Sequence, residues 1–87
     1  MGREEIGKVF HYYPKAGVAA IAISAGELKV GDTIMIEGAT SSITMEVGSM
    51  QMEHAQVQKA AAGRSIGIKV PERVRPGDKV YRIEPTP

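Results

Sequence analysis

Glycine and proline interrupt this sequence about every eight to twelve residues, and this spacing limits the possible folds more than any other feature. Turns at such intervals are typical of an all-β sandwich or barrel, in which short strands follow one another directly. A chain of alternating helices and strands needs longer segments between its turns. The sequence therefore predicts an all-β fold.

Alternating hydrophobic and polar residues locate the strands between these turns. The clearest case is Ile43, Met45 and Val47, which alternate with polar neighbours as in a strand with one buried and one wet face. A second segment alternates in the same way through Ile68, so we place Ile68 in the core. At least six strands result, over residues 6–13, 18–24, 33–37, 43–47, 66–70 and 79–83.

Residues 52–62 do not follow this alternation. Four of them are alanines that stand among Gln, Lys and Glu, a composition with a high intrinsic preference for helix. Local propensity alone predicts a short helix that ends at Gly63, where glycine would serve as the C-cap. Tertiary contacts often override propensity, and the alternative is a strand through Val57.

One short pattern occurs twice, at residues 28–34 (LKVGDTI) and at residues 74–80 (VRPGDKV). We interpret each copy as a tight turn that enters a strand. Pro76 fixes the first central dihedral of a type II turn, and Gly77 supplies the positive φ of the second. Asp32 and Asp78 would accept hydrogen bonds from nearby backbone amides, so both are predicted to be structural and not catalytic.

Length and composition set the class of protein. The 87 residues suffice for one domain, 1–87, with a modest core at about residues 6–83. No stretch approaches the roughly 18 apolar residues of a membrane span, and the charged N-terminus has no signal-peptide core behind it. We therefore predict a cytoplasmic protein without membrane contact. Cysteine and asparagine are absent, a depletion that is typical of thermophilic proteins.

Four motifs occur in an order that matches one known family. They are residues 28–34 (LKVGDTI), 47–51 (VGSMQ), 61–68 (AAGRSIGI) and 74–80 (VRPGDKV). Together they resemble domain 2 of the translational GTPases, the β-barrel that follows the GTP-binding domain in elongation factor Tu and its relatives. The resemblance implies a closed, six- to seven-stranded antiparallel Greek-key barrel without exposed sheet edges. It also makes residues 52–62 a loop and a strand, in place of the helix.

The resemblance does not imply GTPase activity. That chemistry belongs to the preceding domain, and the sequence has no phosphate loop of the form GxxxxGK followed by Ser or Thr. We expect no nucleotide hydrolysis and no cofactor. In elongation factor Tu this domain helps to hold the aminoacyl end of tRNA through an acidic residue and an Asn, whereas the matching positions here are Ser49 and Ser65. Similar barrels also serve as accessory modules of U32-type peptidases.

Basic residues concentrate in the C-terminal part of the chain. Residues 54–82 hold seven Lys or Arg against two acidic groups, whereas residues 1–53 hold four against seven. If several of them share one face, they form a surface that attracts the phosphates of RNA. The alternative is a solvated surface with the charges scattered around the barrel. The candidate RNA contacts are Lys59, Arg64, Lys69, Arg73 and Arg75.

Three of the four aromatic residues cluster around His11. Strand alternation predicts Phe10 and Tyr12 on one face and Tyr13 on the other, as a platform for bases or as a core phenylalanine with tyrosines at the barrel rim. His54 is the other histidine and follows Glu53, but a third ligand at a recognisable spacing is missing. We therefore predict neither a metal site nor a catalytic residue.

Met50 and Met52 flank Gln51 on a predicted rim, where they would form an adaptable protein-binding surface if exposed or fill the barrel if buried. These observations favour a non-catalytic binding module for RNA or a ribonucleoprotein. The alternative is an accessory protein-interaction module that docks on a larger enzyme or factor.

Overall fold

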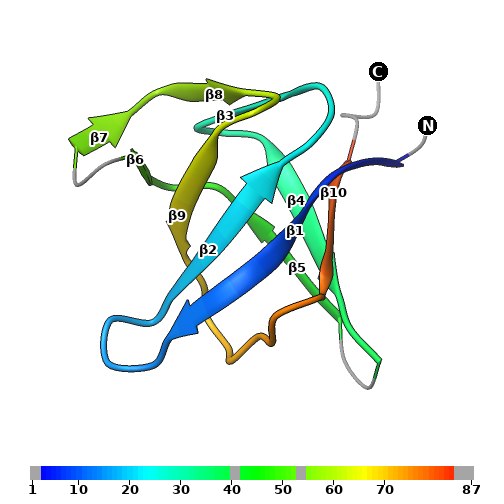
Figure 1. Ribbon diagram of the computed structural model, residues 1–87, viewed down its shortest axis with the longest axis vertical. Helices are drawn as coiled ribbons and strands as arrows, with labels where there is room; N and C mark the ends of the chain where they lie inside the picture. The colour runs from blue at the N-terminus through cyan, green and yellow to red at the C-terminus, as the bar shows by residue number, and fades with distance from the viewer. Residues whose placement is uncertain (1–2, 40–41, 53–54, 84–87) are drawn as a thin grey trace.

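The computed structural model describes residues 3–39, 42–52 and 55–83, which form β-strands joined by turns (Figure 1). Within these residues no helix is long and apolar enough to cross a membrane. The strands of this part of the chain are β1 (Arg3–Tyr13), β2 (Val18–Ile23), β3 (Glu27–Lys29), β4 (Thr33–Glu37), β5 (Ser42–Glu46), β6 (Met50–Met52), β7 (Ala55–Val57), β8 (Lys59–Ala61), β9 (Ser65–Lys69) and β10 (Lys79–Ile83).

Eight of these strands form one antiparallel sheet, in the order β5-β4-β10-β1-β2-β9-β6-β7, and β3 pairs with β8 in a separate two-stranded sheet. Figure 1 shows the large sheet wrapping around a common interior, with β3 and β8 at one end. The all-β antiparallel prediction is confirmed. A closed barrel of six or seven strands is not detected among the described residues, in which eight strands form one sheet and no ladder joins β5 to β7. Strands β6, β7 and β8 have three residues each.

The six predicted strands are all present, although β1 already begins at Arg3. The helix that local propensity predicts over residues 52–62 is wrong, and the strand expected from the family resemblance is confirmed. The physical reason is tertiary: Ala60 lies opposite Leu28 in the β3–β8 ladder and is buried in the core. As part of a strand, the Ala60 side chain is buried in the core. In a solvent-exposed helix the same side chain would be exposed to water.

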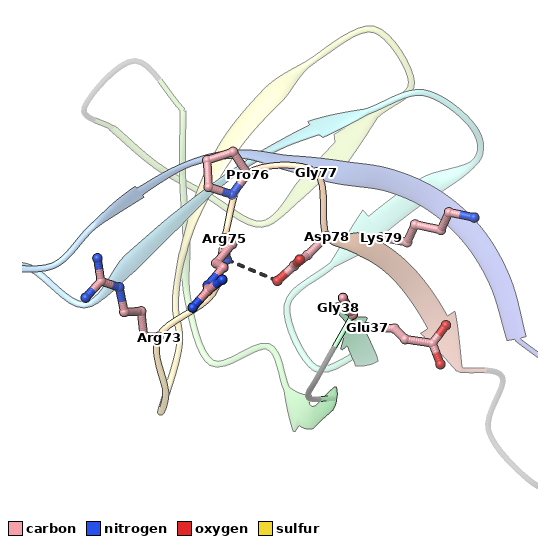
Figure 2. A pocket seen from close by; sticks show the side chains of 9 residues that line it. Glu37, Gly38, Arg73, Arg75, Pro76, Gly77, Asp78 and Lys79 are labelled. Carbon is pink, nitrogen blue, oxygen red and sulfur yellow. Dashed lines mark hydrogen bonds between the residues drawn. The ribbon is translucent and has the colours of Figure 1, made fainter.

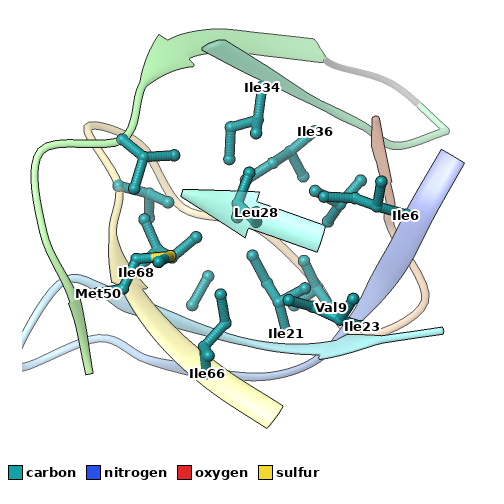
Figure 3. Close-up of a cluster of buried hydrophobic side chains, with 14 of the residues drawn as sticks. Ile6, Val9, Ile21, Ile23, Leu28, Ile34, Ile36, Met50, Ile66 and Ile68 are labelled. Carbon is teal, nitrogen blue, oxygen red and sulfur yellow. The ribbon is translucent and has the colours of Figure 1, made fainter. Parts of the chain in front are cut away.

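The core is a cluster of aliphatic side chains from the strands and from the segments that join them (Figure 3). Leu28 lies near its middle, with Ile34 and Ile36 on one side and Ile21 and Ile66 on the other. The predicted alternation is confirmed, since Ile66 and Ile68 are 3% and 1% exposed, whereas Ser65 and Lys69 at the two ends of β9 face water. Burying such a side chain contributes about 1.5–3 kcal/mol, so this cluster supplies most of the stabilisation.

The repeated sequence pattern forms two equivalent turns. Asp32 Oδ2 accepts a hydrogen bond from the Lys29 amide at 2.9 Å, and Asp78 Oδ2 accepts one from the Arg75 amide at 3.0 Å. In each turn the aspartate amide also donates back, to the Lys29 carbonyl at 3.0 Å and to the Arg75 carbonyl at 3.1 Å. Gly77 has the positive φ, 97°, that the predicted type II turn requires. The structural role predicted for both aspartates is confirmed.

Both turns also hold a buried valine in the same way. The Gly31 amide donates to the Val47 carbonyl at 2.8 Å, and the Val47 amide donates to the Asp32 carbonyl at 2.8 Å. The second turn repeats this pair of bonds on Val9, with Gly77 and Asp78 as its partners, at 2.7 and 2.8 Å. The short internal repeat is therefore a repeated structural unit, which ties β4 to the end of β5 and β10 to β1.

A β-bulge changes the direction of the aromatic residues in β1. The register between β1 and β2 shifts between Val9 and His11, and one extra residue in β1 breaks the simple alternation. As a result Tyr12 packs against the core, while Phe10 and Tyr13 are 50% and 49% exposed. The predicted placement of Phe10 and Tyr12 on one face, and of Phe10 in the core, is therefore wrong.

Candidate binding surfaces

A hollow of about 560 Å³ lies between β1 and the loop that precedes β10. We call it the arginine hollow, and its lining residues are His11, Tyr12, Arg73, Val74, Arg75 and Pro76. A neighbouring cleft of about 690 Å³ shares Arg73, Arg75 and Pro76 and extends to Glu37, Asp78 and Lys79. Figure 2 shows Arg73 and Arg75 on one side of Asp78, and Lys79 with Glu37 on the other. Among the described residues that line the arginine hollow none is acidic, whereas Glu37 and Asp78 line the neighbouring cleft.

The loop holds the two arginines through its own contacts. Val74 is buried in the core, so Arg73 and Arg75, which flank it, extend into solvent. The Arg75 amide is fixed by Asp78 Oδ2, drawn as the dashed line in Figure 2. Gly38 packs against this turn so closely that a Cβ atom there would lie 2.8 Å from Asp78 Oδ1. The two arginines are therefore positioned by three features: the burial of Val74, the hydrogen bond to Asp78 and the close packing of Gly38.

The five predicted RNA-contacting residues are all exposed but do not share one surface. Lys59 and Arg64 line a different hollow of about 410 Å³ beside β8, together with Met52 and Glu27. Strand β9 separates this hollow from the loop of Arg73, and its five residues span roughly 13 Å at about 3.3 Å per residue. Lys69 lies at the end of β9. The structure therefore brings Arg73 and Arg75 together and leaves Lys59 and Arg64 at the other end of the molecule.

A third surface is apolar and was missed by sequence reasoning. The aromatic hollow has a volume of about 440 Å³, and its lining includes Phe10, Tyr13, Lys15, Ala20, Ser65 and Gly67. Its floor consists of small side chains, and a Cβ atom on Gly67 would approach Val18 Cγ1 to 3.1 Å. The sequence feature that could have indicated this hollow is strand β2, which is rich in alanine and follows the aromatic cluster of β1. The bulge that turns Phe10 outward could not be seen in the alternation.

The methionine surface predicted from the sequence is wrong for Met50. Its side chain is 1% exposed, because Met50 faces the core opposite Ile68 and Val57 in the sheet. Met52 is half-buried and lines the hollow beside β8. His11 is exposed and makes an edge-to-face contact with Tyr13, with the ring centroids 4.4 Å apart. Glu53 and His54, for which no metal site is predicted, lie outside the described residues.

The sequence of this domain matches the family model "Elongation factor Tu domain 2" over residues 17–71. The chain belongs to the elongation factor Tu domain 2 family. The resemblance inferred from the four motifs is thereby confirmed. Several solved structures share the fold. The C-terminal domain of a Geobacillus thermoleovorans protein described as a U32 peptidase is 19% identical with a TM-score of 0.85, and the match covers 93% of each chain. GDP-bound aIF5B from Aeropyrum pernix is 24% identical with a TM-score of 0.78, over 97% of this chain and 17% of that one.

Similar sequences occur within larger proteins named as proteases. A collagenase of Porphyromonas gingivalis is 41% identical over 80 residues, which cover 91% of this chain and 22% of the collagenase. An uncharacterized protease of Methanocaldococcus jannaschii is 43% identical over 83 residues, which cover 94% of this chain and 20% of that protein. This member of the elongation factor Tu domain 2 family thus spans about a fifth of the length of these relatives.

Proposed function

We propose that this domain is a non-catalytic accessory module that docks on the body of a U32-type or collagenase-like peptidase, as part of the same polypeptide or as a separate chain. The observation that carries the proposal is the aromatic hollow, in which Phe10 and Tyr13 are about half exposed above a floor of small residues. The identity of 41–43% to two proteins named as proteases supports the choice of partner. Catalysis is assigned to the four-fifths of such proteins that this chain does not span.

The exposed aromatic surface is large enough to contribute to docking. Phe and Tyr side chains bury about 150–250 Å² each when fully covered, so covering the exposed half of both removes roughly 200 Å² from water. At about 25 cal/mol per Å² this burial contributes roughly 5 kcal/mol before the entropy of association is subtracted. Tyrosine is also among the residue types that are enriched at energetically dominant interface positions.

The test is isothermal titration calorimetry of this domain with a U32-type peptidase from which the matching domain has been removed. We expect binding by the natural domain and a loss of at least tenfold in affinity for the double variant Phe10→Ala, Tyr13→Ala. The matched control is Lys59→Ala with Arg64→Ala, which alters the hollow at the other end of the molecule and should bind normally. Equal binding by both double variants would contradict docking through the aromatic hollow, and no binding by the natural domain would contradict the accessory role.

A second candidate function is binding of RNA or a ribonucleoprotein in the cytoplasm. It is favoured by the arginine hollow, where two arginines lie beside exposed His11. Arginine is well suited to phosphate because its planar guanidinium donates two parallel hydrogen bonds. Titration with total tRNA and ribosomal RNA at two salt concentrations tests this function. Binding that weakens as salt rises is expected, and no binding at low salt would contradict it.

A further inference from the structure

The arginine hollow is lined by two kinds of group, guanidinium groups and aromatic residues. Arg73 and Arg75 supply positive charge, and His11 and Tyr12 supply aromatic rings. Among the described residues that line this hollow, none is acidic. Its volume of about 560 Å³ falls within the range of small-ligand sites, about 300–1,000 Å³. The chemistry of the hollow therefore suits a ligand that carries both a negative charge and a flat ring.

The cationic side of the hollow is organised before any ligand arrives. The buried side chain of Val74 and the hydrogen bond from the Arg75 amide to Asp78 Oδ2, at 3.0 Å, fix the backbone on both sides of the arginines. In Figure 2 both arginine side chains leave the loop on the same side of the turn. Because the backbone is already held, binding orders only the side chains, which lowers its entropic cost.

The aromatic side is oriented by the bulge in β1. The register shift between Val9 and His11 lets two consecutive residues, His11 and Tyr12, line the same hollow, which regular strand alternation forbids. The exposed imidazole ring makes an edge-to-face contact with Tyr13, at an interplanar angle of 70°, which favours this orientation of the ring. An exposed, oriented ring next to two guanidinium groups is the arrangement on which unpaired bases stack in single-strand binding proteins.

We propose that the arginine hollow binds an unpaired nucleotide of single-stranded RNA, with its phosphates on Arg73 and Arg75 and its base on the His11 ring. The inference rests on the second candidate function and names its site. A duplex is excluded as the preferred ligand because its bases are stacked on one another and cannot reach the ring. An acidic protein segment would use the arginines but leave the aromatic wall without a partner.

The experiment measures fluorescence anisotropy of a labelled ten-nucleotide uridine oligomer and of a ten-base-pair RNA duplex, each titrated with the protein at several salt concentrations. The variants are Arg73→Ala with Arg75→Ala, and His11→Ala. The matched control is Lys59→Ala with Arg64→Ala, which removes two positive charges at the other end of the molecule. All of these residues are exposed, so unchanged thermal melting is expected and is verified for each variant.

The arginine variant should lose at least about tenfold in affinity, and its slope of log K against log salt should fall by about 1.4, since each single-strand phosphate contact contributes roughly 0.7. His11→Ala should lose at least about fivefold without a change in slope, because stacking releases no counterions. The control should leave both quantities unchanged. The natural protein should bind the single strand more tightly than the duplex.

The contrary outcomes separate the site from the function. RNA binding that survives in the arginine variant, or that the control weakens equally, would leave the RNA function standing and overturn the arginine hollow as its site. Equal affinity for duplex, or full competition by polyglutamate at equal charge concentration, would overturn the assignment to an unpaired nucleotide. No RNA binding by the natural protein at low salt would overturn the RNA function and its site together.

Discussion

Replacing Asp32 or Asp78 by alanine should destabilise the protein by the same amount. Each aspartate accepts one hydrogen bond from the backbone amide three residues earlier, at 2.9 and 3.0 Å. Each turn also holds a buried valine through the same two backbone bonds. If the two turns are copies of one structural unit, removal of the same carboxylate from each should have the same effect on the free energy of unfolding.

The expected magnitude follows from the type of bond. A hydrogen bond to a charged group contributes about 1.5–3 kcal/mol, and a neutral one about 0.5–1.5 kcal/mol. Both bonds here are exposed to solvent, which screens the charge, so we expect a loss of about 1 kcal/mol for each variant. For a domain of this size, 1 kcal/mol corresponds to a decrease in Tm of about 4–8 °C.

The assay is urea unfolding followed by circular dichroism, together with thermal melting. Glu72→Ala is the matched control, because it removes an exposed carboxylate from the loop that also carries Asp78. Its unfolding free energy should change by less than about 0.5 kcal/mol. The reasoning is refuted if either aspartate variant is as stable as this control, or if one loses about 1 kcal/mol and the other nothing.

Three further variants test the packing. Ile68→Ala should lower the free energy of unfolding by about 2–5 kcal/mol in urea titrations, and a negligible loss would mean that Ile68 does not fill the core. Gly7→Ala should prevent stable folding by thermal melting, since its Cβ would collide with the Ala22 carbonyl oxygen, whereas Gly48→Ala has free space and should melt normally. Gly38→Ala should displace the Asp78 carboxylate and weaken RNA binding at the arginine hollow, and unchanged affinity would argue against that coupling.

The strands and turns were predictable because local chemistry specifies them. Alternation identified Ile68 as a core residue, and the Pro76-Gly77 pair predicted the turn in which Gly77 has a positive φ. Segment 50–61 was not predictable in the same way. Its alanines favour helix locally, but β8 pairs with β3, where Ala60 lies opposite Leu28, and β6 pairs with β9, so residues distant in sequence specify these strands.

The candidate sites depended on features that one strand's sequence does not contain. A bulge is defined by the register between two strands, so the outward turn of Phe10 could not be derived from β1 alone. The sequence identifies the basic residues as candidate RNA contacts. Which of them lie on one surface depends on which end of β9 each residue is near. Composition therefore predicted Arg73 and Arg75 together with Lys59 and Arg64, and the fold separated the two pairs.

The most direct test of the accessory role is NMR shift mapping of the ¹⁵N-labelled domain during titration with the body of a U32-type peptidase. The proposal predicts that the largest amide shifts cluster around Phe10, Tyr13 and Gly67, which surround the aromatic hollow. Shifts centred instead on Lys59 and Arg64, or a spectrum that does not change at saturating peptidase, would contradict it.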